Sequence, residues 1–368
     1  MIRVLVADDS RAFRAILRTI LGRSPEIDVV GEARDGQEAV SQVLSLKPDV
    51  VTMDVQMPGK DGLEALGEIM RQRPTPVVVI SAEVGPGNQE RSFRALELGA
   101  VEVLAKPRAD VLGRFEKEAE EIRMAVRAVA GLKLVTRHRR LPRAAAPPPS
   151  PGERPATPSG PFPPRPASPA PIGSPSPQAP RVLGIVASTG GPAALARILS
   201  DLPAGYPIPI LVVQHIADGF EGGLVRWLSG ETSLRTKLAQ DGEALRSSTV
   251  YVAPSGSHLG AASGAVRLLG GEPVRGFRPS GTVLFRTLAR QYGSGAAGLV
   301  LSGMGEDGAE GLKLLRESGA WTLAQGPQTS VVYGMPRVAR ERGAVAVTLE
   351  LEEIAAALKK LARGAGPA

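Results

Sequence analysis

Short apolar runs alternate with amphipathic stretches through residues 1–135. Five apolar runs, the predicted strands, cover Ile2–Ala7, Ile27–Ala33, Asp49–Met53, Pro76–Ser81 and Val101–Leu104. The stretches between and after them carry apolar residues at helical spacing and predict helices over Arg11–Leu21, Gln37–Ser45, Gly62–Arg73, Asn88–Leu98 and Ala109–Val129. Strict strand–helix alternation with apolar strands is typical of a doubly wound parallel sheet. We therefore predict an α/β domain with five parallel strands over residues 1–135.

Residues 181–368 repeat this alternation less regularly and predict a second α/β domain with a mainly parallel sheet. Apolar runs predict strands at Val182–Ala187, Ile208–Gln214, Leu238–Gln240, Thr249–Ala253, Ala265–Leu269, Gly298–Ser302 and Ala320–Ala324. Helical spacing predicts helices at Ala193–Leu199, Leu224–Leu228, Val283–Tyr292, Ala309–Ser318, Met335–Glu341 and Leu351–Arg363. We expect one β-hairpin, in which Thr249–Ala253 pairs with Ala265–Leu269 around a turn at Pro254–Gly264.

The segment 136–180 between the two domains breaks both patterns. Sixteen of its residues are proline, and alanine, serine and glycine make up much of the remainder. Such a composition cannot bury a core and favours an extended, mobile chain. We predict a flexible linker, and no sequence feature singles out a proline-rich docking motif in it.

The net charge of +7 belongs mainly to this linker, which holds six arginines against one glutamate. The basicity therefore does not indicate a folded nucleic-acid-binding face. The chain has no cysteine, which excludes a disulfide, a thiolate nucleophile and a cysteine-based metal site. Asp8 and Asp9 interrupt the first apolar run, and no uncharged apolar run approaches about 18 residues. We expect a cytoplasmic protein without a secretory signal or membrane insertion.

Five side chains with distinctive chemistry fall at predicted strand ends of the first domain, where doubly wound sheets bind ligands. They are Asp8, Asp9, Asp54, Ser81 and Lys106. Three carboxylates on one edge repel each other unless a hard divalent cation such as Mg²⁺ joins them. A carboxylate can form an aspartyl phosphate, while a lysine and a hydroxyl hold the phosphoryl oxygens. Each residue alone is typical of a solvated surface, but the five together indicate phosphoryl chemistry.

The second domain opens with a strand that ends abruptly in Ser188-Thr189-Gly190-Gly191, followed by Pro192. Proline is favoured at the first helical position, and glycines allow a sharp turn. The serine thus lies near a helix N-terminus, whose free N–H groups and partial positive charge suit a developing oxyanion. A phosphate-binding turn or a purely structural turn stays open as an alternative.

The three histidines narrow the choice of a catalytic base. His138 lies in the linker, and His258 lies in a turn between the predicted hairpin strands. His215 ends a buried strand, as Ser188 does, and the glycine-rich loop 303–308 with Asp307 follows another. A triad in which His215 takes the serine proton and Asp307 orients the ring is one interpretation. A structural histidine and a plain acidic turn are the other.

The motifs of the first domain resemble those of response-regulator receiver domains, which are flavodoxin-like. The matching residues are Asp8-Asp9, 51–62, Ser81-Ala82 and Lys106-Pro107. The resemblance implies Asp54 as the phosphoryl acceptor and Mg²⁺ on Asp8, Asp9, Asp54 and the Gln56 backbone carbonyl. It also implies that Ser81 and Lys106 contact the phosphoryl group. Receivers usually carry an aromatic residue where this chain has Val103, so we expect the loop after the fourth strand to signal instead.

The motifs of the second domain, and the order of the two domains, resemble the chemotaxis protein-glutamate methylesterases, the CheB family. The matching segments are 187–191, Gln214-His215, 303–309 and 333–336. The resemblance implies a triad of Ser188, His215 and Asp307, with oxyanion and substrate contacts near Thr189, Gly190 and Met304. Two departures are Ile216-Ala217, where the family commonly has Met-Pro, and Phe277, where it often has histidine.

The resemblance implies a phosphorylation-activated serine hydrolase. Its substrates would be glutamate γ-methyl esters and certain glutamines on chemoreceptor cytoplasmic helices, which release methanol or ammonia. A histidine kinase of the chemotaxis system would donate phosphate, and the catalytic domain would need no metal. We expect the unphosphorylated receiver to pack across the mouth of the Ser188 site and to block a bulky substrate.

Two interpretations from other classes compete with this one. A receiver fused to a non-catalytic receptor-docking module predicts no turnover and no need for Ser188. A DNA-binding regulator requires a helix-turn-helix and a basic recognition face. The second domain shows neither feature, and its serine–glycine turn would then lack a role.

Overall fold

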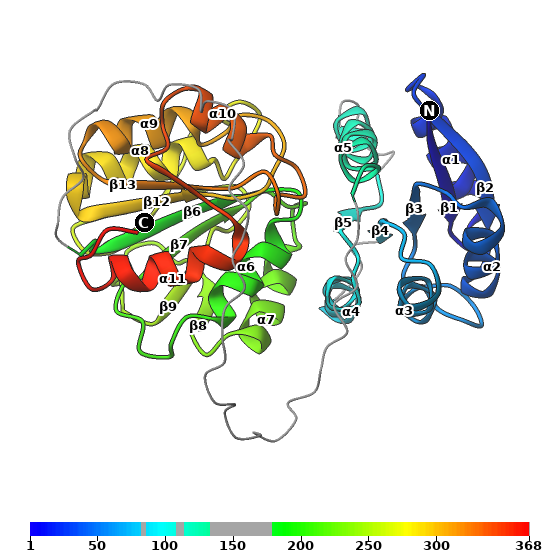
Figure 1. Ribbon diagram of the computed structural model, residues 1–368, viewed down its shortest axis with the longest axis horizontal. Coiled ribbons are helices and arrows are strands. Elements are labelled where there is room, and N and C mark those ends of the chain that lie inside the picture. Colours follow the sequence, from blue (N-terminus) through cyan, green and yellow to red (C-terminus); the bar gives the residue numbers. More distant parts are fainter. Residues whose placement is uncertain (82–85, 108–113, 133–178, 368) are drawn as a thin grey trace, which may run out of the picture.

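The computed structural model describes residues 1–81, 86–107, 114–132 and 179–367. They form two α/β bodies, each with its own sheet (Figure 1). Nearly all of the predicted linker lies outside the described residues, as does the loop after the fourth strand at 82–85. No described helix combines the length and the apolar character needed to cross a membrane.

The first body is a sheet of five parallel strands in the order β2-β1-β3-β4-β5, which confirms the predicted doubly wound fold. Its strands are β1 (Ile2–Ala7), β2 (Ile27–Ala33), β3 (Val50–Met53), β4 (Val77–Ser81) and β5 (Glu102–Ala105). Its helices are α1 (Arg11–Gly22), α2 (Gly36–Leu46), α3 (Gly62–Gln72), α4 (Pro86–Glu97) and α5 (Arg114–Val129). The start of the last predicted helix falls on residues 108–113, which are not described.

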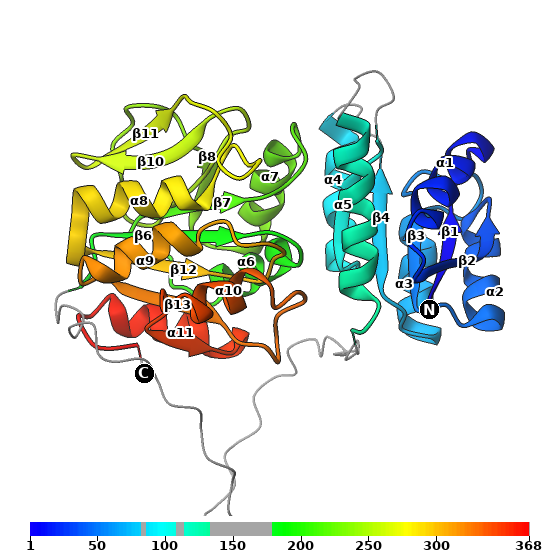
Figure 2. The ribbon, with the colours of Figure 1, turned by 90° about the horizontal axis from the view of Figure 1, so that it is seen from above.

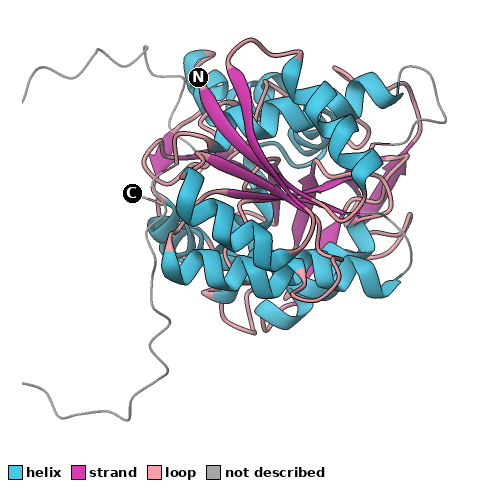
Figure 3. Cartoon of the chain, turned by 90° about the vertical axis from the view of Figure 1, so that its right-hand side faces the viewer, coloured by secondary structure: helices cyan, strands magenta, loops and turns pink. Residues whose placement is uncertain are grey.

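Local chemistry explains where the helices of this body begin. Ser10 and Asp35 accept backbone N–H groups of the first turns of α1 and α2. Asp61 and Glu64 form a reciprocal capping box at the start of α3. Figure 3, which looks onto this body, shows helices on both sides of the strands. The strands are therefore apolar on both faces, as the sequence predicted.

The second body is built on seven parallel strands in the order β14-β13-β12-β6-β7-β9-β8. They are β6 (Val182–Ala187), β7 (Ile210–Gln214), β8 (Arg235–Leu238), β9 (Thr249–Val252), β12 (Ala296–Val300), β13 (Trp321–Gln325) and β14 (Val347–Leu349). The helices are α6 (Gly191–Ser200), α7 (Glu221–Glu231), α8 (Gly281–Tyr292), α9 (Ala309–Glu317), α10 (Met335–Glu341) and α11 (Leu351–Leu361). A mainly parallel second sheet is thus confirmed.

The predicted partners of the β-hairpin are wrong. β9 lies between β7 and β8 in the parallel sheet, whereas β11 (Ala265–Leu269) pairs antiparallel with β10 (His258–Ala262). The sequence concealed β10 because glycine and alanine fill its centre, and strands are usually recognised from β-branched and aromatic residues. Small residues are required there: a Cβ at Gly260 would lie 2.7 Å from Thr287 Oγ1 on α8.

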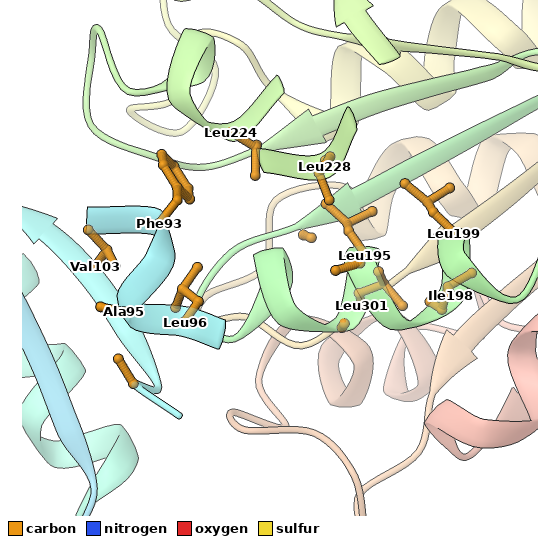
Figure 4. Close-up of a cluster of buried hydrophobic side chains, with 14 of the residues drawn as sticks. Phe93, Ala95, Leu96, Val103, Leu195, Ile198, Leu199, Leu224, Leu228 and Leu301 are labelled. Carbon is orange, nitrogen blue, oxygen red and sulfur yellow. The ribbon is translucent and has the colours of Figure 1, made fainter. Parts of the chain in front are cut away.

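The two bodies meet along the side of the first that carries α4, β5 and α5 (Figures 1 and 2). Phe93 of α4 stacks on Trp227 of α7 with ring centroids 5.9 Å apart, and Trp227 Nε1 donates to Glu97 at 3.0 Å. Figure 4 shows Phe93 of α4 near Leu224 of α7, and Leu96 belongs to the same buried cluster. Buried apolar side chains of both bodies therefore form one continuous cluster at this junction.

Candidate active site

Ser188 lies in the turn between β6 and α6, at the carboxyl end of the central strand. Gly190 begins the helix with a positive φ of 75°, which favours glycine because other residues are strained there. The Ser188 N–H donates to the Ser302 carbonyl at 3.0 Å, which ties this turn to the loop after β12. A Cβ at Gly303 would lie 2.6 Å from Ser188 Cβ, so only glycine lets that loop come so close. The backbone around Ser188 is thus held from two sides.

A buried amide joins the Ser188 turn to the end of the neighbouring strand. Gln214 Nε2 donates to the backbone carbonyls of Ser188 and His215, each at 2.9 Å. The side chain of Gln214 is buried, and its Oε1 has no hydrogen-bond partner in the described structure. Because one planar amide bonds both carbonyls, it fixes the separation of the two backbones that carry the serine and the histidine.

His215 and Asp307 are brought together as predicted. The His215 Nε2 and the Asp307 Oδ2 atoms lie 2.9 Å apart, and both side chains are buried. His215 Nδ1 is also buried and has no hydrogen-bond partner among the described residues. An imidazole held by a carboxylate at one nitrogen and unpaired at the other is arranged to accept a proton.

The Asp307 carboxylate rests on the N-terminus of α8. It accepts hydrogen bonds from Ser280 Oγ at 2.7 Å, Gly281 N at 2.6 Å and Thr282 N at 3.1 Å. Burial alone would raise the pKa of Asp307, but the His215 contact and these hydrogen bonds bring it well below the ordinary value. The carboxylate is therefore ionised and fixed in orientation, which suits the support of an imidazolium.

His258 is not among the residues that line the cavity over Ser188, whereas His215 is. His258 lies in β10, buried, and its Nδ1 accepts the backbone N–H of Ser280 at 3.1 Å, while Nε2 lies 3.1 Å from the Glu272 carbonyl. It thus supports the residue that hydrogen-bonds Asp307. The placement agrees with the choice of His215 over His258 as the candidate base.

Phe277 lies against the candidate base. Its ring is parallel to that of His215 within 12°, with centroids 4.0 Å apart. The departure noted in the sequence therefore covers one face of the imidazole with an apolar ring. Such a face limits the rotation of His215 and excludes water from that side.

The loop after β12 is anchored from outside by ion pairs. Glu306 contacts the guanidinium groups of Arg275 and Arg342, and Glu310 pairs with Arg286 at 3.2 Å. These pairs are partly exposed, so each contributes little stability alone. Their position holds the loop that carries Met304 and Asp307 over the end of the sheet.

A cavity of about 580 Å³ lies over Ser188 and His215 and is lined on one side by the first body. Thr189, Met304 and Phe277 line it from the second body, with Ile216 and Ala217. From the first body it is lined by β5 together with residues of α5, among them Glu102 and Met124. Ser188 and His215 therefore face the first body across this cavity.

A second candidate site lies at the strand ends of the first body. Oxygen atoms of Asp8, Asp9 and Asp54 lie within 4.8 Å of one another. Lys106 Nζ lies 2.6 Å from both Asp8 Oδ2 and Asp54 Oδ2, and the backbone N–H of Gln56 donates to Asp54 Oδ1 at 3.2 Å. These predicted residues are thus brought together.

The charges of this acidic pocket are unbalanced. Burial raises the pKa of Asp8 above its ordinary value, although Lys106 opposes the rise. Burial would lower the pKa of Lys106, but its contacts with Asp54 and Asp8 raise it overall. Three carboxylates face one ammonium group, and oxygen donors of this kind fit a hard cation such as Mg²⁺. Ser81 is buried at the end of β4, and its carbonyl accepts the Lys106 N–H at 2.9 Å.

Four features of the candidate site were not predicted from the sequence. The Gln214 bridge, the Ser280 contact to Asp307, the Phe277 stack and the placement of Glu102 all depend on tertiary contacts between distant segments. Two of them had a signal available: Gln214 directly precedes His215 within a segment already singled out, and Phe277 stands where the family often has histidine.

The chain matches two family models. Residues 4–113 match the response regulator receiver domain and residues 183–358 match the CheB methylesterase. The protein-glutamate methylesterase/protein-glutamine glutaminase 1 of Syntrophus aciditrophicus is 42% identical over 100% of both chains. The protein-glutamate methylesterase/protein-glutamine glutaminase 2 of Anaeromyxobacter dehalogenans is 44% identical over 98% of this chain and 97% of its own.

Two solved structures from Thermotoga maritima are also similar. The CheB methylesterase catalytic domain covers 50% of this chain and 98% of its own at 34% identity, with a TM-score of 0.47. The response regulator domain of CheB covers 36% of this chain and 99% of its own at 40% identity, with a TM-score of 0.33. Because near-complete relatives share more than two-fifths of their residues with it, the chain belongs to the protein-glutamate methylesterase/protein-glutamine glutaminase family, the CheB response regulators of chemotaxis.

Proposed function

We propose that this chain hydrolyses glutamate γ-methyl esters, and deamidates glutamines, on the cytoplasmic part of chemoreceptors, with Ser188 as nucleophile. The observation that carries the proposal is the His215 ring, which contacts Asp307 through Nε2, keeps Nδ1 buried without a hydrogen-bond partner among the described residues, and lines the same cavity as Ser188. Because the proposed substrate is the cytoplasmic part of a receptor, we propose that the reaction takes place in the cytoplasm.

The reaction consists of two acyl transfers. Ser188 Oγ attacks the γ-carbonyl carbon while His215 Nδ1 takes the hydroxyl proton, and Asp307 stabilises the imidazolium. His215 then gives the proton to the leaving oxygen or nitrogen, the bond to it breaks, and methanol or ammonia departs. Water, deprotonated by His215, cleaves the glutamyl–serine ester and regenerates Ser188 with a free glutamate.

The start of α6 offers stabilisation for the oxyanion of both tetrahedral intermediates. Thr189, Gly190 and Met304 surround Ser188 at this point, and a helix N-terminus carries a partial positive charge. Preorganised N–H donors here contribute more than they would in bulk water once the bound substrate excludes water from the site. We assign these three residues to the oxyanion and substrate contacts.

The first body serves as the phosphoryl-accepting receiver of the chemotaxis histidine kinase. An Asp54 carboxylate oxygen attacks phosphorus, and the phosphoryl group passes from the kinase histidine to Asp54. Asp8, Asp9, Asp54 and the Gln56 carbonyl would hold Mg²⁺, which neutralises phosphoryl charge when bound. Lys106 and Ser81 would contact the phosphoryl oxygens, which requires Lys106 to leave its present contact with Asp54.

We assign residues 1–135 to the receiver, 136–180 to the linker and 181–368 to the catalytic domain. In the resting protein the receiver covers the Ser188 cavity. A bulky receptor helix cannot reach the serine until that packing loosens, so phosphorylation would activate by relief of occlusion.

The test is the release of methanol from methylated receptor, measured with and without a small phosphodonor. We expect slow release by the resting chain, faster release with phosphodonor, and none from Ser188→Ala. Receptor binding without any methanol release from the parent chain would favour the docking-module alternative instead.

A further inference from the structure

One side chain of the receiver reaches the candidate oxyanion site. Glu102, the first residue of β5, accepts the backbone N–H of Gly190 at 3.1 Å through Oε2 and also a hydrogen bond from the Thr189 side chain. Only 8% of Glu102 is exposed. Its Oε1 accepts the N–H of Val103, the next residue, at 3.3 Å. The carboxyl group therefore sits in the cavity of the second body rather than in water.

The chemistry of Glu102 matches that of the substrate. A glutamyl side chain that presents its γ-carboxyl carbon and oxygens to Gly190 and Thr189 has the same atoms as a receptor glutamate, less the methyl group. The contact also uses the Gly190 N–H at the start of α6, and Gly190 is one of the three residues assigned above to the oxyanion and substrate contacts. A substrate γ-carbonyl and Glu102 cannot both accept this N–H.

The surroundings favour the neutral form of Glu102, which resembles the ester and amide substrates more closely than the ion does. Burial is the main cause that raises its pKa to about 7, and hydrogen bonds from Gly190, Val103 and Thr189 only partly oppose it. Glu121 of α5 adds a like charge that raises the pKa further. The other ionisable groups that line the cavity are Glu118 and Glu120 of α5 and, on the second body, His215, Asp218, Arg275 and Arg278.

We propose that Glu102 is an internal substrate mimic, a glutamyl γ-acyl group of the receiver that occupies the Gly190–Thr189 acyl subsite and competes with the receptor. The inference rests on the proposed function, and it specifies both the ligand of that subsite and the contact that phosphorylation must break. β5 supplies the connection: Glu102 begins this four-residue strand and Lys106 directly follows it, beside Asp54. Under this proposal, a movement of Lys106 toward a phosphoryl group shifts β5 and withdraws Glu102 from Gly190.

Three substitutions of Glu102 in the unphosphorylated full chain distinguish the effect of its γ-acyl group on the basal rate from the effects of its size and its charge. Glu102→Leu keeps the size and removes the acceptor, so the basal rate on receptor should rise about 5- to 10-fold. The basal rate of Glu102→Ala should rise at least as much. Glu102→Gln keeps a neutral γ-carbonyl, so its basal rate should not rise above that of the parent. Intact mass must show that the introduced side chain of Glu102→Gln remains an amide, because the enzyme family deamidates glutamines.

The matched control is Glu97→Gln at the same interface. Glu97 accepts from Trp227 far from the Gly190 contact, and glutamine can still accept that bond. Its basal rate should equal that of the parent. A rise in Glu97→Gln as large as in Glu102→Leu would mean that loss of any carboxylate charge from this interface activates, and the substrate-mimic role would be rejected.

The pH dependence has a defined sign. A carboxyl whose pKa is higher when docked than when free favours docking most at low pH, and this advantage is lost as the pH rises from about 4.5 to about 7. The basal rate of Glu102→Leu relative to the parent should therefore be largest near pH 6 and smaller near pH 8. Glu102→Gln should match the parent near pH 6 and be slower near pH 8. A ratio independent of pH for both variants would overturn the neutral-mimic assignment.

Acetate supplies the atoms that Glu102→Ala removes. In that variant acetate should lower the basal rate competitively with receptor, relative to chloride at equal ionic strength, and it should act far less on Glu97→Gln. Equal inhibition of both variants would show that the cavity binds acetate without any link to Glu102.

Hydrogen exchange of the Gly190 amide measures the protection given by its hydrogen bond to Glu102, without any need for turnover. Exchange in the peptide that contains Gly190 should be faster in Glu102→Leu than in the parent and unchanged in Glu102→Gln. Unchanged exchange in Glu102→Leu would refute the contact itself. Absence of activity in every variant, together with the expected exchange pattern, would refute the proposed hydrolase function and the substrate-mimic role while leaving the contact in place.

Discussion

Both bodies place their chemistry at the carboxyl ends of parallel strands, yet the two sites balance charge in opposite ways. In the receiver, Asp8 and Asp54 share a single lysine, and Asp9 adds a third carboxylate at the same edge. In the catalytic body, Asp307 alone receives three hydrogen bonds from the start of α8 in addition to its contact with His215. The first arrangement has an excess of negative charge, and the second is saturated with donors.

The comparison shows how similar sheets serve different chemistry. An edge with excess carboxylate attracts a cation and then a phosphoryl group. An edge whose single carboxylate already accepts several hydrogen bonds has few lone pairs free to bind a cation, and the fixed carboxylate orients the neighbouring imidazole instead. Substitutions at the two edges should therefore fail in different ways.

The largest effect on kcat is expected for the residues around Asp307 in the catalytic body. Ser188→Ala and His215→Ala should each lower kcat by about 10⁶-fold, and the double variant should be little worse, because a triad acts as a unit. Asp307→Asn should lose less, about 10⁴-fold, because Ser188 and His215 remain. Methanol release from methylated receptor measures all four. If His258→Ala, while folded, lost as much as His215→Ala, the base would have been assigned wrongly.

The second effect concerns the receiver, and it tests whether the receiver inhibits only by covering the Ser188 cavity. Fragment 181–368 should hydrolyse receptor esters about tenfold faster than the unphosphorylated full chain, since the cover over the serine is gone. Asp54→Ala should stay at the resting rate whatever phosphodonor is added. The measurement is kcat/KM on receptor, after cooperative unfolding has shown that the fragment is folded. A folded fragment no faster than the resting chain would point to direct activation by the receiver.

The Gln214 bridge should have an intermediate effect. Gln214→Leu removes both donors to the Ser188 and His215 carbonyls, so kcat should fall about 5- to 10-fold with little change in KM, since small misplacements of reacting groups are costly. Exposed Gln240→Leu is the matched control and should match the parent. An unchanged kcat in Gln214→Leu would show that the rest of the backbone network holds the two residues without the amide.

The smallest effect is expected at the aromatic neighbour of His215. Phe277→Leu loses the stacked face and should lower kcat about 3- to 10-fold, whereas Phe277→Tyr keeps the ring and should stay near the parent. Comparing the two variants at several pH values distinguishes support of the imidazole from simple packing, because only the former alters the pH profile. Equal rates for the leucine and tyrosine variants would leave Phe277 without a positioning role.

The elements and the catalytic candidates were predictable because periodicity and strand-end residues are local signals. Ser188, His215 and Asp307 each end or follow an apolar strand, and parallel topology brings such ends together. β10 was missed because its small residues carry no strand signal, and its true partner could not be read from spacing. The Glu102 contact joins residues 88 positions apart across two bodies, and no property of residue 102 in the sequence indicates that it is buried.

The stacking of Phe93 on Trp227 gives the molecule an optical property. The chain has two tryptophans, and the other one, Trp321, lies in β13 of the second sheet. Trp227 sits at the junction of the two bodies, where its ring nitrogen donates to Glu97. Separation of the bodies exposes this indole to water and alters its emission, so Trp321→Phe yields a protein whose intrinsic fluorescence follows the opening of the resting arrangement in real time.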